Sequence, residues 1–214
     1  MRKFAILSII ICGALSLCHA RPAADEAQQY YVAGVAFYNV ENLFDTINQN
    51  GRFDLDYTPE GRRMWDSIRY NNKLDNLAAA ITTAMTTPET PDGPSIIGLS
   101  EVENESVVRD LAARIDATLL AQGRNPWGLQ YIHHDSPDPR GIDVAMLYNP
   151  AYFEVSNVNN HEFLLPDEPT FRTRDQMVVS GHLLGFPLSV VVNHWPSRLG
   201  GQQESEYRRI AAGQ

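Results

Sequence analysis

The centre of the chain reads Pro94-Ser95-Ile96-Ile97-Gly98-Leu99-Ser100-Glu101-Val102-Glu103-Asn104. An apolar run between Pro and Gly signals predicts a buried strand, and this one runs up to Glu101. In layered α/β proteins, the side chains that do chemistry collect in the crevice outside the carboxyl ends of such strands. Glu101 is therefore a candidate functional residue.

Two other segments repeat this pattern of an apolar run that ends in a polar side chain. One is Val35-Ala36-Phe37-Tyr38-Asn39, and the other is Leu188-Ser189-Val190-Val191-Val192-Asn193-His194. Because strand ends of this kind gather at one crevice, we expect Asn39, Glu101 and His194 to converge at one edge of the sheet.

The rest of the chain predicts helices packed on a strand-rich core, which is an α+β class. Apolar residues at helical spacing predict helices over 66–85, 104–123 and 203–212, with Asp66 or Ser67 capping the first and Asn104 the second. Further strands are expected at 31–40, 130–133, 142–148, 151–158, 176–184 and 186–193. Leu184-Gly185-Phe186-Pro187 indicates a tight hairpin between the last two strands. No shift of composition marks a second domain.

Residues 1–20 are organised like a secretory signal peptide. Arg2 and Lys3 form a basic start, residues 4–17 are mostly apolar, and Cys18-His19-Ala20 offers small residues at the positions a signal peptidase reads. A transmembrane anchor is the weaker interpretation because the apolar run is short for a bilayer. Lipid attachment at Cys18 is disfavoured by Leu17. We expect export to the periplasm or the medium, and a mature domain over 21–214 without a cysteine.

The chain is acidic, with 17 Lys+Arg, 26 Asp+Glu and a formal net charge of −9. This disfavours a protein that binds nucleic acid mainly through a basic surface. It is compatible with an enzyme whose bound cation supplies the local positive charge. The sequence has no Gly-x-Ser-x-Gly elbow, P-loop or Gly-x-Gly-x-x-Gly motif. Serine-hydrolase, nucleoside-triphosphatase and dinucleotide-binding functions are therefore not indicated.

The strand-end side chains suit a hard divalent cation. Asn39 and Glu101 offer the oxygen ligands that Mg²⁺, Mn²⁺ and Ca²⁺ prefer, although on spacing alone a solvent-facing or loop-capping role fits them better. His194 suits a general acid, a general base or a hydrogen bond to a phosphoryl oxygen, and a structural role is equally consistent. His133 and His134 are neighbours on a strand and point to opposite faces, so we do not expect a zinc site there.

Arginines supply candidate phosphate-binding groups. Arg140, Arg174 and Arg198 follow or flank turn-forming segments, and Arg172 lies close by. A guanidinium is a planar fork that matches phosphate oxygens. Any single one of them is more often a surface cation.

Taken together, four segments resemble the endonuclease/exonuclease/phosphatase superfamily, which includes the DNase I-like nucleases. They are Phe37-Tyr38-Asn39-Val40-Glu41-Asn42-Leu43-Phe44-Asp45, Ile97-Gly98-Leu99-Ser100-Glu101-Val102-Glu103-Asn104, Arg140-Gly141-Ile142-Asp143-Val144-Ala145-Met146-Leu147-Tyr148 and Val192-Asn193-His194-Trp195-Pro196-Ser197-Arg198. Within the family, the chain is most similar to a secreted bacterial branch of extracellular nucleases.

The resemblance implies a four-layer α/β/β/α sandwich and metal-assisted hydrolysis of phosphate esters, with Mg²⁺ the expected cation. It places the divalent ion at Asn39 and Glu101, and a histidine near the scissile phosphate at His194. Asn193 beside it is a further catalytic candidate, and Arg140, Arg174 and Arg198 are the candidates for binding substrate phosphate on their own chemistry. The expected substrate is a nucleic acid. The alternative substrates are a phosphomonoester and a phospholipid. The alternative to an enzyme is a non-catalytic remnant of the fold. After leader removal we expect a monomer without stable membrane association.

The sequence also departs from the family pattern. A later Gly-Asp-x-Asn segment and a terminal Asp-His pair, which supply further polar contacts and the group that activates water, do not occur before Gln214. We therefore expect a domain that lacks its C-terminal strands, and weak or no activity for these 214 residues alone.

Overall fold

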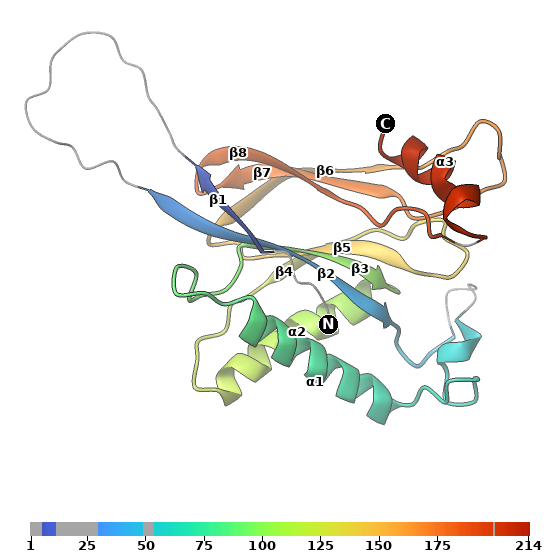
Figure 1. Ribbon diagram of the computed structural model, residues 1–214. Helices are drawn as coiled ribbons and strands as arrows, with labels where there is room; N and C mark the ends of the chain where they lie inside the picture. Colours follow the sequence, from blue (N-terminus) through green and yellow to red (C-terminus); the bar gives the residue numbers. More distant parts are fainter. Residues whose placement is uncertain (1–5, 12–29, 49–53, 199) are drawn as a thin grey trace, which may run out of the picture.

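The computed structural model describes residues 6–11, 30–48, 54–198 and 200–214. In these residues it contains two β-sheets that face each other and three α-helices (Figure 1). Helices α1 (Ser67–Ala84) and α2 (Glu105–Ala121) cover the outer face of the larger sheet, and α3 (Gln202–Ala212) lies at one end of the smaller sheet. The predicted α+β class, with two stacked sheets and helices outside them, is confirmed.

The larger sheet has five strands in the order β1-β2-β3-β5-β4 within the described residues. Their bounds are Ile6–Ile11, Tyr31–Leu43, Ile96–Val102, Asp143–Tyr148 and Gln130–His133 in that order. β2 and β3 are parallel, and the other neighbours are antiparallel. β3 is central and buried on both faces, which is why its sequence reads as a continuous apolar run rather than an alternating one.

The smaller sheet is an antiparallel meander of β6 (Phe153–His161), β7 (Gln176–Leu183) and β8 (Phe186–Val192). The predicted hairpin joins β7 to β8 through Leu184 and Gly185, which have φ angles of 52° and 85°. A two-residue turn with positive φ at both residues has a backbone twist that matches the twist of the two antiparallel strands. The inner face of this sheet packs on β3 and β5 through Ile96, Met146, Phe153, Met177 and Val179.

The helices form where their caps and apolar faces predict them. The Asp66 carboxylate accepts a hydrogen bond from the Arg69 backbone N–H, and the Asn104 side chain does the same for Val107. Apolar side chains of both helices fill a second core against the five-stranded sheet, among them Leu74, Leu77, Ile81, Leu111, Ile115 and Leu119. None of the helices that the structure describes has the length and apolar character needed to cross a membrane.

The structure differs from the sequence prediction at the N-terminus, where residues 1–20 were expected to lie outside the fold. β1 pairs with β2 from Ile6 opposite Ala36 to Ile11 opposite Tyr31. The physical reason is that a run rich in isoleucine favours strands, and the edge of β2 offers unpaired backbone groups. The rest of the expected leader lies outside the described residues, and its removal stays a prediction.

Candidate active site at the mouth between the sheets

β2 and β3 both lose their regular register where the candidate residues lie. Pairing between them runs to Asn39 opposite Ser100 and resumes only at Leu43 opposite Val102. Glu101 lies in the gap with a φ of 65°, and Glu41 and Asn42 have φ angles of 56° and 61°. Side-chain-bearing residues rarely adopt this left-handed backbone, at a cost of about 1–3 kcal/mol each. Such irregularities re-aim side chains next to functional sites, and this one turns Glu101 out of the strand alternation.

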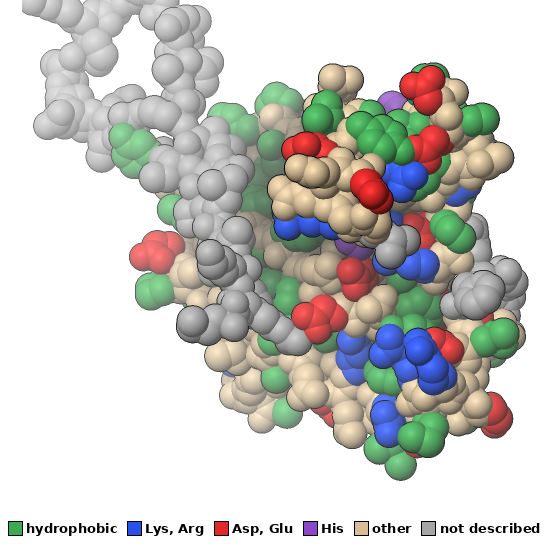
Figure 2. All heavy atoms as spheres, turned by 45° about the vertical axis from the view of Figure 1, so that its right-hand side comes forward, with side chains coloured by type: hydrophobic (Ala, Val, Ile, Leu, Met, Phe, Trp, Pro, Cys, Tyr) green, Lys and Arg blue, Asp and Glu red, His purple; other side chains and the backbone are tan. Residues whose placement is uncertain are grey.

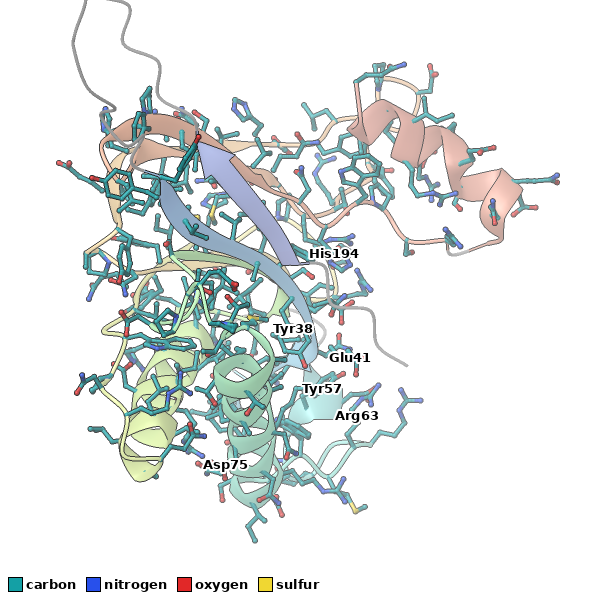
Figure 3. All side chains as sticks on the ribbon, turned by 60° about the vertical axis from the view of Figure 1, so that its left-hand side comes forward. Tyr38, Glu41, Tyr57, Arg63, Asp75 and His194 are labelled. Carbon is teal, nitrogen blue, oxygen red and sulfur yellow. The ribbon has the colours of Figure 1, made fainter. Side chains whose placement is uncertain are left out.

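Asn39, Glu101 and His194 converge on one carboxylate oxygen. Nδ2 of Asn39 donates to Oε1 of Glu101 at 3.0 Å, and Nε2 of His194 lies 3.6 Å from the same oxygen. The convergence agrees with the sequence prediction, but its location does not. His194 follows β8 of the three-stranded sheet, so the residues meet at the mouth between two sheets rather than at one edge of a single sheet. Figure 3 shows His194 facing the end of β2 that carries Tyr38 and Glu41.

His194 is held neutral at this mouth. Burial lowers the pKa of its imidazole to about 4, and the charges of Arg174 and Arg140 act in the same direction, whereas Glu101 opposes them. A neutral imidazole presents one N–H donor and one acceptor. Its Nδ1 is buried and makes no hydrogen bond within the described part of the chain.

Arg174 makes several internal contacts, and its predicted role in substrate binding stays a prediction. Its guanidinium donates to Oδ2 of Asp138 at 2.7 Å and to the carbonyl oxygens of His194 and Trp195. The Arg174 and Asp138 side chains are 3% and 4% exposed. Because the buried guanidinium donates to these internal acceptors, Arg174 holds the His194 backbone, and it also lines a hollow beside Arg140.

The other predicted site residues, Arg140, Asn193 and Arg198, differ in their exposure and in their contacts. Arg140 is half exposed, lies 3.3 Å from Asp138 through its Nε, and is close enough to lower the pKa of His194. Oδ1 of Asn193 is buried and has no hydrogen-bond partner among the described residues. Arg198 is exposed, and no described hydrogen bond or ion pair joins it to Glu101 or His194.

Two hollows with cationic linings lie near the candidate residues. A hollow of about 430 Å³ between β2 and α1 reaches Asn39 and includes Trp65, Arg69 and Lys73. A second, of about 310 Å³, is lined by Arg140, Arg172 and Arg208 among others. Figure 2 shows Lys and Arg side chains on both sides of acidic side chains near the middle of this face. An acidic protein therefore concentrates positive charge around its candidate centre.

Glu103 is a feature that the spacing of residues did not reveal. Its position before a predicted helix favours an acid in the first helical turn. In the structure Glu103 precedes α2, is 3% exposed and accepts a hydrogen bond from the Asp45 backbone N–H at 2.7 Å. Burial, reinforced by the nearby Asp45 and Asp54 carboxylates, raises its pKa to about 8. The loop after β2 brings these acids together, and no local pattern signals that approach.

The residues at the mouth fit a hard divalent cation. Glu101 presents a partly exposed carboxylate, and its described side-chain hydrogen bond comes from Asn39. Oδ1 of Asn39 accepts from the Glu41 backbone N–H at 2.8 Å, which leaves its amide nitrogen toward Glu101. A cation held by both residues would need the amide to turn over, since only the amide oxygen is a ligand.

Comparison with known proteins decides the family. A model of the endonuclease/exonuclease/phosphatase family matches residues 34–214. The chain belongs to the endonuclease/exonuclease/phosphatase family. This membership covers all four segments that carried the resemblance. No match was found among the curated proteins.

Several solved structures are similar to this family member. TDP2 from Caenorhabditis elegans is 17% identical, with 69% of this chain and 36% of that chain covered and a TM-score of 0.44. ANGEL2, a 2′,3′-cyclic phosphatase, is 15% identical over 82% and 44% of the two chains, with a TM-score of 0.49. A family protein from Bacteroides thetaiotaomicron is 18% identical over 73% and 48%, with a TM-score of 0.42. The chain spans less than half the length of each.

Proposed function

We propose that this chain carries the divalent-cation centre of a phosphoesterase that hydrolyses phosphodiester bonds in nucleic acids. The observation that carries the proposal is the meeting of Asn39, Glu101 and His194 at one carboxylate oxygen, near cationic hollows. Family membership supports phosphoester chemistry. Glu101 and Asn39 would hold Mg²⁺ or Mn²⁺, which when bound supplies Lewis-acid stabilisation of charge on a phosphoryl oxygen.

The protein's own residues bind and orient the substrate. His194, neutral at pH 7, is positioned to donate a hydrogen bond to a phosphoryl oxygen without carrying a charge of its own. The bonds from Arg174 to the His194 and Trp195 carbonyls hold the backbone that carries the imidazole. Arg140, with an exposed guanidinium, supplies a planar fork for substrate phosphate.

The two hollows favour a diester over a monoester. A diester phosphate has two substituents, and there are two cation-lined hollows, one next to Asn39 and one around Arg140. Lys73 and Arg69 line one hollow, and Arg172 and Arg208 line the other, so flanking phosphates of a polynucleotide would meet cations in both directions.

The test is hydrolysis by the purified protein with Mg²⁺ or Mn²⁺, comparing single-stranded DNA, RNA, a phospholipid and p-nitrophenyl phosphate. The activity of these 214 residues is expected to be weak. Among the four substrates we expect the nucleic acids to be cleaved fastest, and Glu101→Gln to lower that rate to background. Glu105→Gln, an exposed acid at the start of α2, is the matched control and should retain the rate.

The other outcomes separate the alternatives. Preference for the phospholipid or the monoester would replace the nucleic-acid substrate with that class. Hydrolysis that proceeds equally well after Glu101→Gln would contradict the assignment of the centre. Absence of turnover, together with absence of cation binding, would instead support a non-catalytic remnant of the fold.

We also propose that the protein is exported after removal of residues 1–20. The charged and apolar organisation of this segment supports export. Mass spectrometry of the protein from the periplasm or medium of an expressing bacterium should give a chain that begins at Arg21. An intact N-terminus in the cytoplasm would contradict export.

A further inference from the structure

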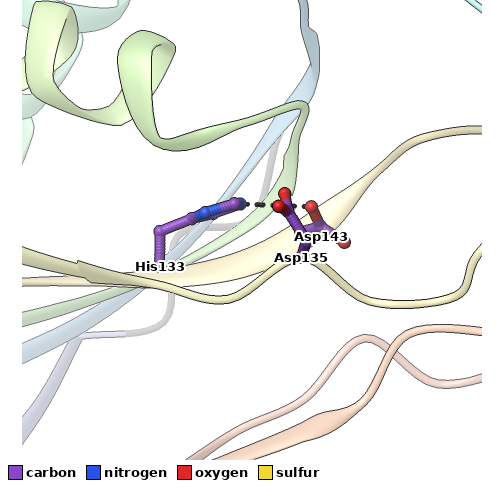
Figure 4. A group of neighbouring side chains, drawn as sticks. All are labelled: His133, Asp135 and Asp143. Atoms are coloured by element: carbon purple, nitrogen blue, oxygen red, sulfur yellow. Dashed lines mark hydrogen bonds and ion pairs between the residues drawn. The ribbon is translucent and has the colours of Figure 1, made fainter. Parts of the chain in front are cut away.

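A second group of possible metal ligands lies away from the Glu101 centre. His133 ends β4, Asp143 begins β5, and Asp135 lies in the loop between them. One ligand atom from each of the three residues lies within 4.8 Å of the other two. Figure 4 shows the three side chains as neighbours. Because they come from two paired strands and their connection, the fold itself brings them together.

This group lies on the opposite face of the five-stranded sheet from the mouth. Along β4, Tyr131 packs in the core beneath the helices, whereas Ile132 packs in the core between the sheets. Successive side chains of a strand point to opposite faces, so His133, two residues after Tyr131, lies on the helix side. Val144 packs between the sheets, so the preceding residue, Asp143, also lies on the helix side. The location is independent of Glu101 and His194, which meet on the side of the three-stranded sheet.

The distances and burial suit ligands of one ion. Nε2 of His133 lies 3.1 Å from Oδ2 of Asp143, and both side chains are 5% exposed. Two ligands that each lie about 2.0–2.2 Å from a shared ion are about 2.9–3.5 Å apart at tetrahedral or octahedral angles. The other oxygen of Asp143 accepts hydrogen bonds from the backbone N–H and the hydroxyl of Ser136, which fixes the carboxylate direction.

The open side of the group gives an ion access and room for water. A hollow of about 540 Å³ is lined by His133, Asp135, Asn104 and Glu105. Asp135 is exposed at its rim, so its carboxylate has the freedom to close on an ion. One imidazole with two carboxylates is a mixed donor set that suits Zn²⁺ and Mn²⁺ better than Ca²⁺ or Mg²⁺.

We propose that His133, Asp135 and Asp143 form a second divalent-metal site, which takes Zn²⁺ or Mn²⁺ and fastens the loop over residues 134–142 to the sheet. The adjacent His133 and His134 have different partners, Asp143 and Asp175, and both line this hollow. A site that uses one histidine with two aspartates does not need both to face the metal.

The test is calorimetric titration of Zn²⁺ into Glu101→Gln, a background in which the first centre is weakened. We expect saturable binding of one ion per chain. Asp135→Asn in this background should lower the affinity by about tenfold or more, and this exposed position leaves the fold intact. His182→Asn, which removes an exposed histidine of β7, is the matched control for adventitious binding and should leave the affinity unchanged.

A second measurement needs no substitution in the site. Histidine NMR spectra should show the His133 imidazole signals shifting on addition of Zn²⁺, while those of His182 stay in place. The proposal is overturned if Glu101→Gln shows no saturable binding, if Asp135→Asn binds as tightly as its background, or if the His133 signals do not respond. Each of these results would leave His133 and Asp143 as a hydrogen-bonded structural pair, and none bears on the Glu101 centre.

Discussion

Arg174→Met should destabilise the protein strongly, because it removes the guanidinium that joins Asp138 to the backbone after β8. The lost ion pair is 2.7 Å long, and its side chains are 3% and 4% exposed. Removing one partner of a buried pair costs about 3–5 kcal/mol. The loss of donors to the His194 and Trp195 carbonyls adds about 1 kcal/mol for each hydrogen bond. Partial relaxation of the turn offsets some of this, so we expect a loss of about 4 kcal/mol in the free energy of unfolding.

The assay is urea denaturation at pH 7 of the wild type, Arg174→Met, Asp138→Asn and the double variant. Because the two side chains contact each other, the double variant should be more stable than the sum of the single losses by about 2 kcal/mol. Arg172→Met is the matched control: its ion pair with Glu162 is 3.8 Å long and largely exposed, so its effect should be below about 1 kcal/mol. A loss in Arg174→Met no larger than in this control, or strict additivity with Asp138→Asn, would refute the structural role of Arg174.

Two further predictions concern the acids and caps behind the centre. The folded pKa of Glu103 is raised to about 8 from an ordinary 4.5, so the stability from its protonated form is complete below pH 4.5 and is lost as the pH rises through 8. Glu103→Gln should remove this pH dependence, whose upper limit is about 5 kcal/mol in the free energy of unfolding. The measurement is urea denaturation with a chelator at pH 5 and pH 8.5. An unchanged difference in stability between the two pH values would contradict the burial effect. Asn104→Ala should lower the free energy of unfolding by about 2 kcal/mol, since Asn104 caps α2 and also donates to Asp45. Asp66→Ala removes only a cap and should lower it by about 1 kcal/mol. Equal losses in thermal or urea unfolding would show that the bond to Asp45 adds nothing.

The fold was largely predictable because its elements are specified locally. The apolar run of β3, the caps Asp66 and Asn104, and the hairpin at Leu184-Gly185 depend on residues that are close in sequence. Hydrophobic periodicity and turn chemistry report such features directly. The pairing of Ile6–Ile11 with β2 was missed because a leader and an edge strand have the same apolar composition.

The site was predicted only in part, because its residues are far apart in the sequence and meet through long-range packing. Strand ends identified Asn39, Glu101 and His194, but not that the last of them comes from a second sheet. The left-handed backbone of Glu101 and the burial of Arg174 depend on register and on long-range packing. Neither leaves a signal in local sequence spacing.

Cation binding at Glu101 is the most direct test of the proposed centre. Calorimetric titration of Mg²⁺ into the wild type should give saturable heat, because a partly exposed carboxylate and an amide suit a hard ion. Glu101→Gln should abolish that heat, whereas Asp135→Asn, on the opposite face of the sheet, should bind Mg²⁺ like the wild type. Equal Mg²⁺ binding by Glu101→Gln and the wild type would contradict the assignment of Glu101 as the ligand on which the proposed activity depends.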